Sequence, residues 1–172
     1  STSTVGATRN FYSHEQDPKR AGRLRIEYTV PATTTSDHKV ALRFPQLAIP
    51  RGSTISSAKI EFTAAATSGP GATKWVIAAE DTGQPAAYAA TASNISNRTG
   101  LTTNTVTINP VPAWTSGDVF ETPDLSAIVN EVVAKSDWCG GSASNALSFI
   151  ITGDTALRLA QSYESGSGEP RL

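Results

Sequence analysis

The clearest periodic pattern in the chain lies in residues 122–153. Apolar residues recur there at helical spacing and form one stripe, made of Leu125, Ile128, Val129, Val132 and Val133. Thr122 or Asp124 is expected to cap the first turn of this helix, because the side-chain oxygens can accept hydrogen bonds from its free amides. Residues 147–152 form a short apolar run rich in branched and aromatic side chains, which predicts a buried strand. The region therefore predicts one amphipathic helix packed against a β domain.

Outside this region the pattern has a period of two, which indicates strands with one wet face. Predicted strands cover residues 24–28, 40–44, 58–62, 73–80, 105–108 and 157–163. A turn at residues 68–71 predicts that the strand after it pairs antiparallel with the strand before it. Residues 81–100 are expected to form a long polar loop. Seven or more short strands with turns between them predict a mostly β fold, an antiparallel β-sandwich or jelly roll carrying one helix.

Composition narrows the class of protein. A length of 172 residues is typical of one domain, and 14 basic against 15 acidic residues leave no concentrated basic face for a nucleic acid. No apolar stretch is long enough to cross a membrane. A chain that opens at Ser1 without methionine, rich in Thr, Ser, Ala and Gly, is expected of a secreted product or a trimmed fragment. We expect residues 1–22 to be a polar leader and residues 23–172 to be one module of a longer extracellular protein.

Several motifs resemble a known family. They are Val40-Ala41-Leu42-Arg43-Phe44, Ile49-Pro50-Arg51-Gly52, Ala58-Lys59-Ile60-Glu61-Phe62, Trp114, Thr122-Pro123-Asp124-Leu125-Ser126, Trp138-Cys139, Asn145-Ala146-Leu147, Ser162-Tyr163-Glu164 and Pro170-Arg171-Leu172. Together they resemble the DNRLRE-type and disaggregatase-related modules of bacterial extracellular proteins. The resemblance implies a jelly roll like that of carbohydrate-binding modules, found in secreted hydrolases, surface adhesins and pilus-associated proteins. Ser142-Ala143-Ser144 is an insertion relative to that pattern.

The carboxyl end, residues 169–172, resembles only the start of a closing strand. Pro170 cannot donate a ladder hydrogen bond, so this piece is expected at a strand start or an edge. An edge left open there is a template for another chain. Residues beyond Leu172, the Ser1 to Asn10 arm of a neighbouring subunit, or the chain's own leader would fill it. The chain's own leader is the expected occupant, because its local concentration is high.

No catalytic group of residues is recognisable. His14 and His38 are the only histidines and lie in polar sequence without a nucleophile context. Glu61 and Glu80 lie on predicted strands, where a solvated face explains them better than a glycosidase pair. The sequence therefore predicts a protein that is not an enzyme.

Calcium is the metal for which the sequence offers ligands, because it binds carboxylate and carbonyl oxygens supplied by loops. The candidate ligands are Asp81, Asp118, Asp154 and Glu164, at loop or element ends. One cysteine and two scattered histidines offer no zinc site. Calcium therefore stays an open prediction, beside the alternative that these acids are caps and solubilising charges.

Aromatic side chains and Cys139 complete the candidate chemistry. Trp114 and Tyr88, on polar connections, are the candidates for stacking on a sugar ring, whereas Trp75 and Trp138 are expected in the core. Cys139 is the only cysteine. We favour its interpretation as a small buried hydrophobe, and a disulfide to another chain or domain is the alternative.

Two functions follow from these observations. The first is a non-catalytic module that binds carbohydrate or another surface ligand. The second is a structural or adhesive subunit of a surface appendage, pilus or filament, with neighbouring domains or subunits as its partners.

Overall fold

The computed structural model describes residues 38–172, with gaps at 69–70, 72, 140–144 and 155. The expected leader, the predicted strand at residues 24–28, His14 and the insertion at residues 142–144 lie outside the described residues.

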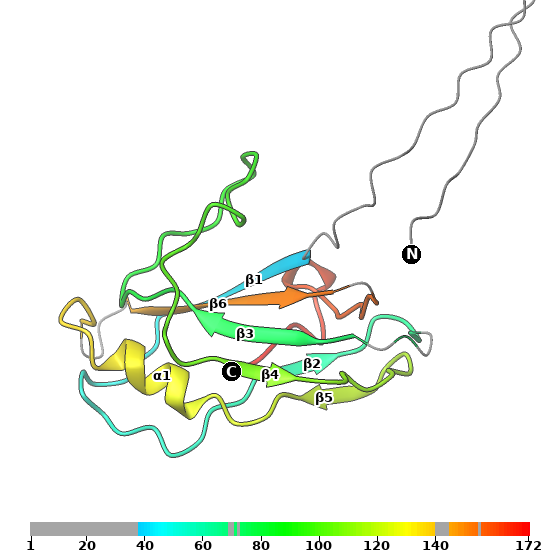
Figure 1. The fold of residues 1–172 in the computed structure, drawn as a ribbon, viewed down its shortest axis with the longest axis horizontal. Helices are drawn as coiled ribbons and strands as arrows, with labels where there is room; N and C mark the ends of the chain where they lie inside the picture. Colours follow the sequence, from blue (N-terminus) through cyan, green and yellow to red (C-terminus); the bar gives the residue numbers. More distant parts are fainter. Residues whose placement is uncertain (1–37, 69–70, 72, 140–144, 155) are drawn as a thin grey trace, which may run out of the picture. The chain divides into compact units, whose positions relative to one another are not determined.

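The described chain is mostly β and contains two antiparallel sheets (Figure 1). The larger sheet has the order β1-β6-β3-β4, made of β1 (His38–Pro45), β6 (Ala146–Gly153), β3 (Trp75–Ala79) and β4 (Val106–Ile108). The smaller sheet pairs β2 (Glu61–Thr63) with β5 (Val119–Glu121). The prediction of a mostly β, antiparallel fold with one short helix is confirmed.

Strand β6 lies in the interior of the larger sheet. Its first six residues are all buried, and it pairs with β1 on one side and β3 on the other. A strand that is covered on both faces carries a continuous apolar run instead of an alternating one, which is the pattern seen at residues 147–152. The predicted buried strand is therefore confirmed.

The predicted hairpin across the glycine-rich turn is wrong. β3 pairs with β4 and β6, whereas β2 pairs with β5 in the other sheet. A turn signal indicates only that the chain reverses direction and does not tell which strand the next one pairs with. β5 was not predicted, because Val119 and Phe120 are too short an apolar run to show a period.

β2 is shorter than the alternation at residues 58–62 predicts. The amides of Ala58 and Ile60 donate to the side chains of Asp124 and Thr122, at 2.9 and 3.0 Å, instead of to a neighbouring strand. Their carbonyls accept from the amides of Leu125 and Thr122. The segment that leads into the helix therefore takes the place of a strand partner.

Residues 157–163 do not form the predicted strand. They contribute one isolated bridge, between Ala64 and Ala160, and lead into a short 3-10 helix, η1 (Tyr163–Ser165). Arg171 pairs with Glu61 through two backbone hydrogen bonds, so the carboxyl end does lie beside β2.

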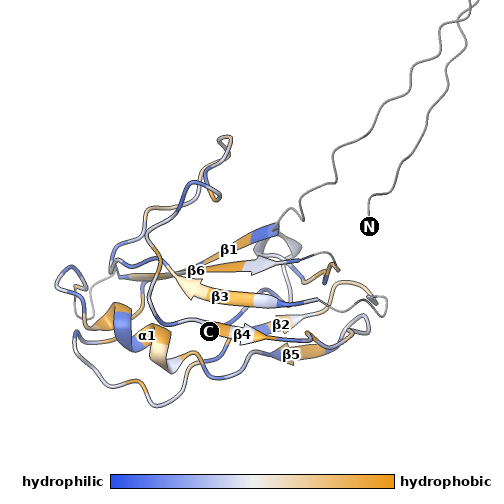
Figure 2. Ribbon diagram, viewed as in Figure 1, coloured by the Kyte–Doolittle hydropathy of each residue, from blue (hydrophilic) through white to orange (hydrophobic). Residues whose placement is uncertain are grey.

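The helix α1 (Ser126–Val133) lies where β3 ends and β6 begins (Figure 1). The predicted apolar stripe is confirmed, because all five of its residues are at most 2% exposed; Figure 2 shows hydrophobic and hydrophilic stripes on the helix. The prediction that Asp124 satisfies a first-turn amide is confirmed, because Asp124 accepts a hydrogen bond from the amide of Ser126, the first helical residue, at 3.0 Å, although Leu125 occupies the cap position itself. Thr122 and Asp124 also hold residues 58–60.

Aromatic side chains join the two sheets. Trp75 of β3 lies 5.9 Å from Phe62 of β2 and 6.0 Å from Phe120 of β5, measured between ring centroids. Trp114 contacts all three rings, at 5.5 to 6.1 Å. Trp138 is buried beyond the helix, as predicted, and its Nε1 donates to the Ile49 carbonyl at 2.8 Å.

Candidate functional site

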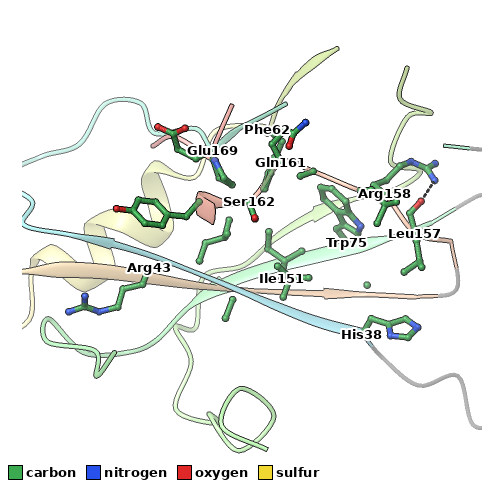
Figure 3. Close-up of a pocket in the computed structure, with 18 of the residues that line it drawn as sticks. His38, Arg43, Phe62, Trp75, Ile151, Leu157, Arg158, Gln161, Ser162 and Glu169 are labelled. Carbon is green, nitrogen blue, oxygen red and sulfur yellow. Dashed lines mark hydrogen bonds between the residues drawn. The ribbon is translucent and has the colours of Figure 1, made fainter. Parts of the chain in front are cut away.

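A groove of about 790 Å³ lies between β1 and the carboxyl-terminal segment (Figure 3). It is lined by apolar side chains from both sheets, among them Phe62, Trp75 and Ile151, and by Trp114 from the connection before β5. Sites that bind ligands in proteins commonly enclose 300–1,000 Å³ and are mostly apolar. We refer to this feature as the β1 groove.

The first wall is β1, an edge strand. Among the described residues β1 pairs only with β6, so its other edge carries main-chain groups without a strand partner. Val40, Leu42 and Phe44 line the groove from one face of the strand, and Phe44 packs edge-on against Phe149 at 6.1 Å. The alternation that predicts this strand therefore also supplies the groove's apolar side.

The second wall is the segment of residues 156–163, held to the small sheet. The Leu159 carbonyl accepts from the Ala65 amide, and the Gln161 amide donates to the Thr63 carbonyl, both at 2.8 Å. Arg158 anchors the segment by donating to the carbonyls of Pro112, Gly71 and Val111 at 2.8 to 3.0 Å. The wall is fixed in place although it is not a regular strand.

Exposed apolar side chains gather at this groove. Six large hydrophobic residues are exposed among the described residues, and four of them line it: Val40, Leu157, Leu159 and Tyr163. Contiguous exposed apolar surface marks interaction sites more often than chance, whereas single exposed residues need no explanation. The clustering therefore identifies the groove as the candidate site.

Charged groups stand at the rim. His38 lies at one end of the groove and Arg43 toward the other, with Arg158 and Glu169 on the opposite side (Figure 3). Arg43 donates from Nε to the Pro85 carbonyl at 3.1 Å. What the groove offers a ligand is thus apolar surface inside, main-chain groups along β1 and charge at its margins.

The two predicted sugar-stacking residues both line the groove, but neither is an open platform. Trp114 is 3% exposed within the aromatic cluster, and its buried Nε1 has no hydrogen-bond partner among the described residues. Tyr88 is half-buried, with the Arg98 guanidinium 4.2 Å above its ring and its hydroxyl bonded to Ser148. Burial raises the pKa of Tyr88 above its ordinary value, and the Ser148 hydrogen bond opposes this.

Three of the four candidate calcium ligands make other polar contacts in the structure. Asp81 pairs with Lys135 at 2.5 Å, and Asp118 accepts from the Thr115 amide at 3.0 Å. Asp154, at the groove's margin, accepts from the Lys74 amide and the Thr73 hydroxyl, and these bonds lower its pKa. Glu164 belongs to η1. Across residues 38–172, outside the gaps, no three His, Cys, Asp or Glu side chains form a group able to hold a metal.

Cys139 is exposed, so its interpretation as a buried hydrophobe is wrong. It follows the buried Trp138, and its Sγ lies 2.7 Å from Nε2 of Gln84, which also donates to the Asp137 carbonyl. The chain has no second cysteine, so a disulfide within it is excluded.

Sequence reasoning missed the groove itself. The sequence carries no signal for it, because Leu157 and Leu159 lie on either side of the polar Arg158 as they would in an ordinary strand.

In the part of the chain that the structure describes, no helix has the length and apolar character needed to cross a bilayer. Comparisons with protein-family models, curated proteins and solved structures each found no match.

Proposed function

We propose that this chain is a non-catalytic extracellular β-sandwich module that binds an extended polypeptide segment in the β1 groove. The observation that carries the proposal is the gathering of four exposed apolar residues around a groove, one of whose walls is a strand edge without a strand partner among the described residues. The aromatic contacts between the two sheets support the sandwich, and the motif resemblance supports a DNRLRE-type or disaggregatase-related module.

Strand addition is the binding mode that suits such a groove. An added strand gains main-chain hydrogen bonds from the edge, and its alternate side chains enter the apolar space. The β1 edge supplies the main-chain hydrogen-bonding groups, and Val40, Leu42 and Leu159 supply the apolar surface. This chemistry favours the structural or adhesive function, in which the fold is joined to other polypeptides.

A labelled peptide tests the proposal directly. The probe has the sequence of residues 22–30, Gly-Arg-Leu-Arg-Ile-Glu-Tyr-Thr-Val, which alternates apolar and polar side chains. The acceptor is the full chain with Leu24→Ser, Ile26→Ser and Tyr28→Ser, so that its own copy of this sequence does not compete. We expect saturable binding by fluorescence anisotropy.

The control acceptor carries Val40→Asp in addition. A carboxylate on the groove's wall removes apolar contact and costs desolvation, so the affinity should fall about tenfold or more. Absence of saturable binding, or equal affinity for both acceptors, would contradict the proposal.

A second candidate function, carbohydrate binding, is favoured by two observations at the same groove. The Trp114 Nε1 proton is a buried donor without a partner in the described chain, and Tyr163 is 83% exposed at the rim. A sugar ring would stack on the exposed tyrosine, and one of its hydroxyls would satisfy the Trp114 donor once the side chains that cover the donor move aside.

A glycan array tests this candidate with the wild-type chain and two variants. Trp114→Phe keeps an aromatic ring and removes the donor, whereas Tyr163→Ala removes the exposed ring. Binding of a glycan class that both variants weaken would favour carbohydrate, and an array without signal would remove this function.

A further inference from the structure

The chain's own sequence contains a segment whose pattern matches the β1 groove. We infer that residues 24–28 of a second copy of this chain add to β1 as a strand, joining copies head to tail. The inference rests on the proposed function and names its partner.

The groove and this segment have complementary patterns. In the segment, Leu24, Ile26 and Tyr28 alternate with Arg25 and Glu27. Added beside β1, such a strand places every second side chain into the apolar groove and leaves the charged side chains outside. Five residues extend over about 17 Å, which is shorter than the eight-residue β1, so the whole apolar face finds a partner surface.

The connection to β1 argues against the same copy. Nine residues, 29–37, separate Tyr28 from His38, where β1 begins at one end of the groove. Hairpin loops usually contain two to five residues, and parallel pairing needs a crossover of about a dozen. Nine residues are long for a hairpin loop and short for a parallel crossover.

The composition of this connection points the same way. It contains no glycine, carries Pro31, and has three consecutive threonines at positions 33–35, which favour extended backbone. Nine fully extended residues span about 30 Å, which is enough for the segment to reach a groove on a neighbouring copy. A neighbouring copy is then the acceptor.

Head-to-tail contact of this kind uses two different surfaces on each copy. Such heterologous contacts form rings when the rotation closes and open filaments when it does not. The full chain is therefore expected to assemble in a concentration-dependent way.

Sedimentation velocity over a concentration series tests the assembly. The donor variant, Leu24→Ser with Ile26→Ser and Tyr28→Ser, should remain a monomer at concentrations where the wild type assembles. Its matched control, Arg23→Ser with Arg25→Ser and Glu27→Ser, changes the opposite face of the same segment and should assemble like the wild type. A wild type that stays monomeric, or two triple variants that behave alike, would overturn the inference.

The decisive experiment mixes two variants with complementary defects. The acceptor variant, Val40→Asp, has a blocked groove but keeps an intact segment 24–28. The donor variant has an intact groove but a segment that has lost its apolar face. Each should be monomeric alone, and together they should form a 1:1 complex and nothing larger. No complex would overturn the inference; Leu159→Asp, on the other wall, serves as acceptor variant if Val40→Asp does not fold.

The peptide assay and the mixing experiment distinguish failure of the groove from failure of the second copy as its partner. If the labelled peptide binds the groove but the mixed variants form no complex, the groove accepts a strand and the second copy is not its source. If the peptide does not bind, the proposed function itself fails.

Discussion

The helix end and the β1 groove both border the apolar interior, but the side chains at the helix end are buried and several of those at the groove are exposed. At the helix end, Leu125, Ile128 and Val132 are fully buried, whereas Val40 and Leu157 at the groove are more than half exposed. Both sets are aliphatic. The difference lies in what covers them, because the helix closes one end and no described element closes the other.

Polar contacts secure the closed end. Asn130 accepts from the Ile55 amide at 2.8 Å and donates to its carbonyl at 3.0 Å, which ties the segment before β2 to the helix. Asp137 accepts from the Thr82 hydroxyl and the Gly83 amide, joining the loop after the helix to the loop after β3. A region fixed by such bonds is built for stability, and the uncovered groove is where binding is expected.

The largest predicted loss of stability comes from a substitution in the helix that closes one end of the apolar interior. Val129→Asp places an unpaired carboxylate among residues at most 2% exposed, which costs several kcal/mol of a typical stability of about 5–15. We expect the variant to be unfolded by circular dichroism. Ala127→Asp, on the exposed face of the same helix, is the matched control. Melting of Val129→Asp at the wild-type temperature would contradict the helix's role.

A second prediction compares two ion pairs. Arg98 pairs with Glu80 at 2.7 Å, with both side chains 12% exposed, and also donates to three backbone carbonyls. Arg98→Met should cost about 3 kcal/mol, because it leaves a buried carboxylate unpaired. Lys59→Met breaks a pair that is about half exposed and should cost less than about 1 kcal/mol. Urea denaturation of both variants measures the contrast, and equal losses would contradict it.

The third prediction concerns acid. The hydrogen bond from the Thr82 hydroxyl, helped by the Gly83 amide, holds the pKa of Asp137 below its ordinary value. The stabilisation is therefore complete above the unfolded-state pKa, about 3.9, and is lost as the pH falls through the lower folded-state pKa. Asp137→Asn should flatten this acid limb of a plot of urea midpoint against pH. An unchanged limb would show that the bond does not contribute.

The smallest predicted effect is at the groove. Val40→Asp changes a side chain that is 53% exposed on an edge strand, so the stability of a dilute monomer should change by less than about 0.5 kcal/mol. A fall comparable with that of Val129→Asp would show that the groove belongs to the folding core and would weaken its role as a binding surface.

The sequence predicted those parts of the fold that local patterns encode. The helical stripe and the buried strand at residues 147–152 are confirmed, because their periods report burial directly. Pairing was not predictable: the turn before β3 does not show that β2 and β3 join different sheets. The exposure of Cys139 has no local signal either, because its neighbour Trp138 is buried.

The candidate site was predictable only in part. Trp114 and Tyr88 were selected as aromatic residues on polar connections, and both do line the groove. The groove itself arises because β1 and the carboxyl-terminal segment, more than 110 residues apart in sequence, approach each other without pairing. Such an opening is a property of the assembled sheets and has no signature in either segment alone.

Hydrogen–deuterium exchange of β1 tests the central claim most directly. In the full wild-type chain at assembling concentration, a strand added in the groove should protect the β1 amides that do not bond to β6. The Leu24→Ser, Ile26→Ser, Tyr28→Ser variant should lose this protection, while β6, paired on both sides, exchanges slowly in both proteins. Identical exchange of β1 in the two proteins would contradict the account.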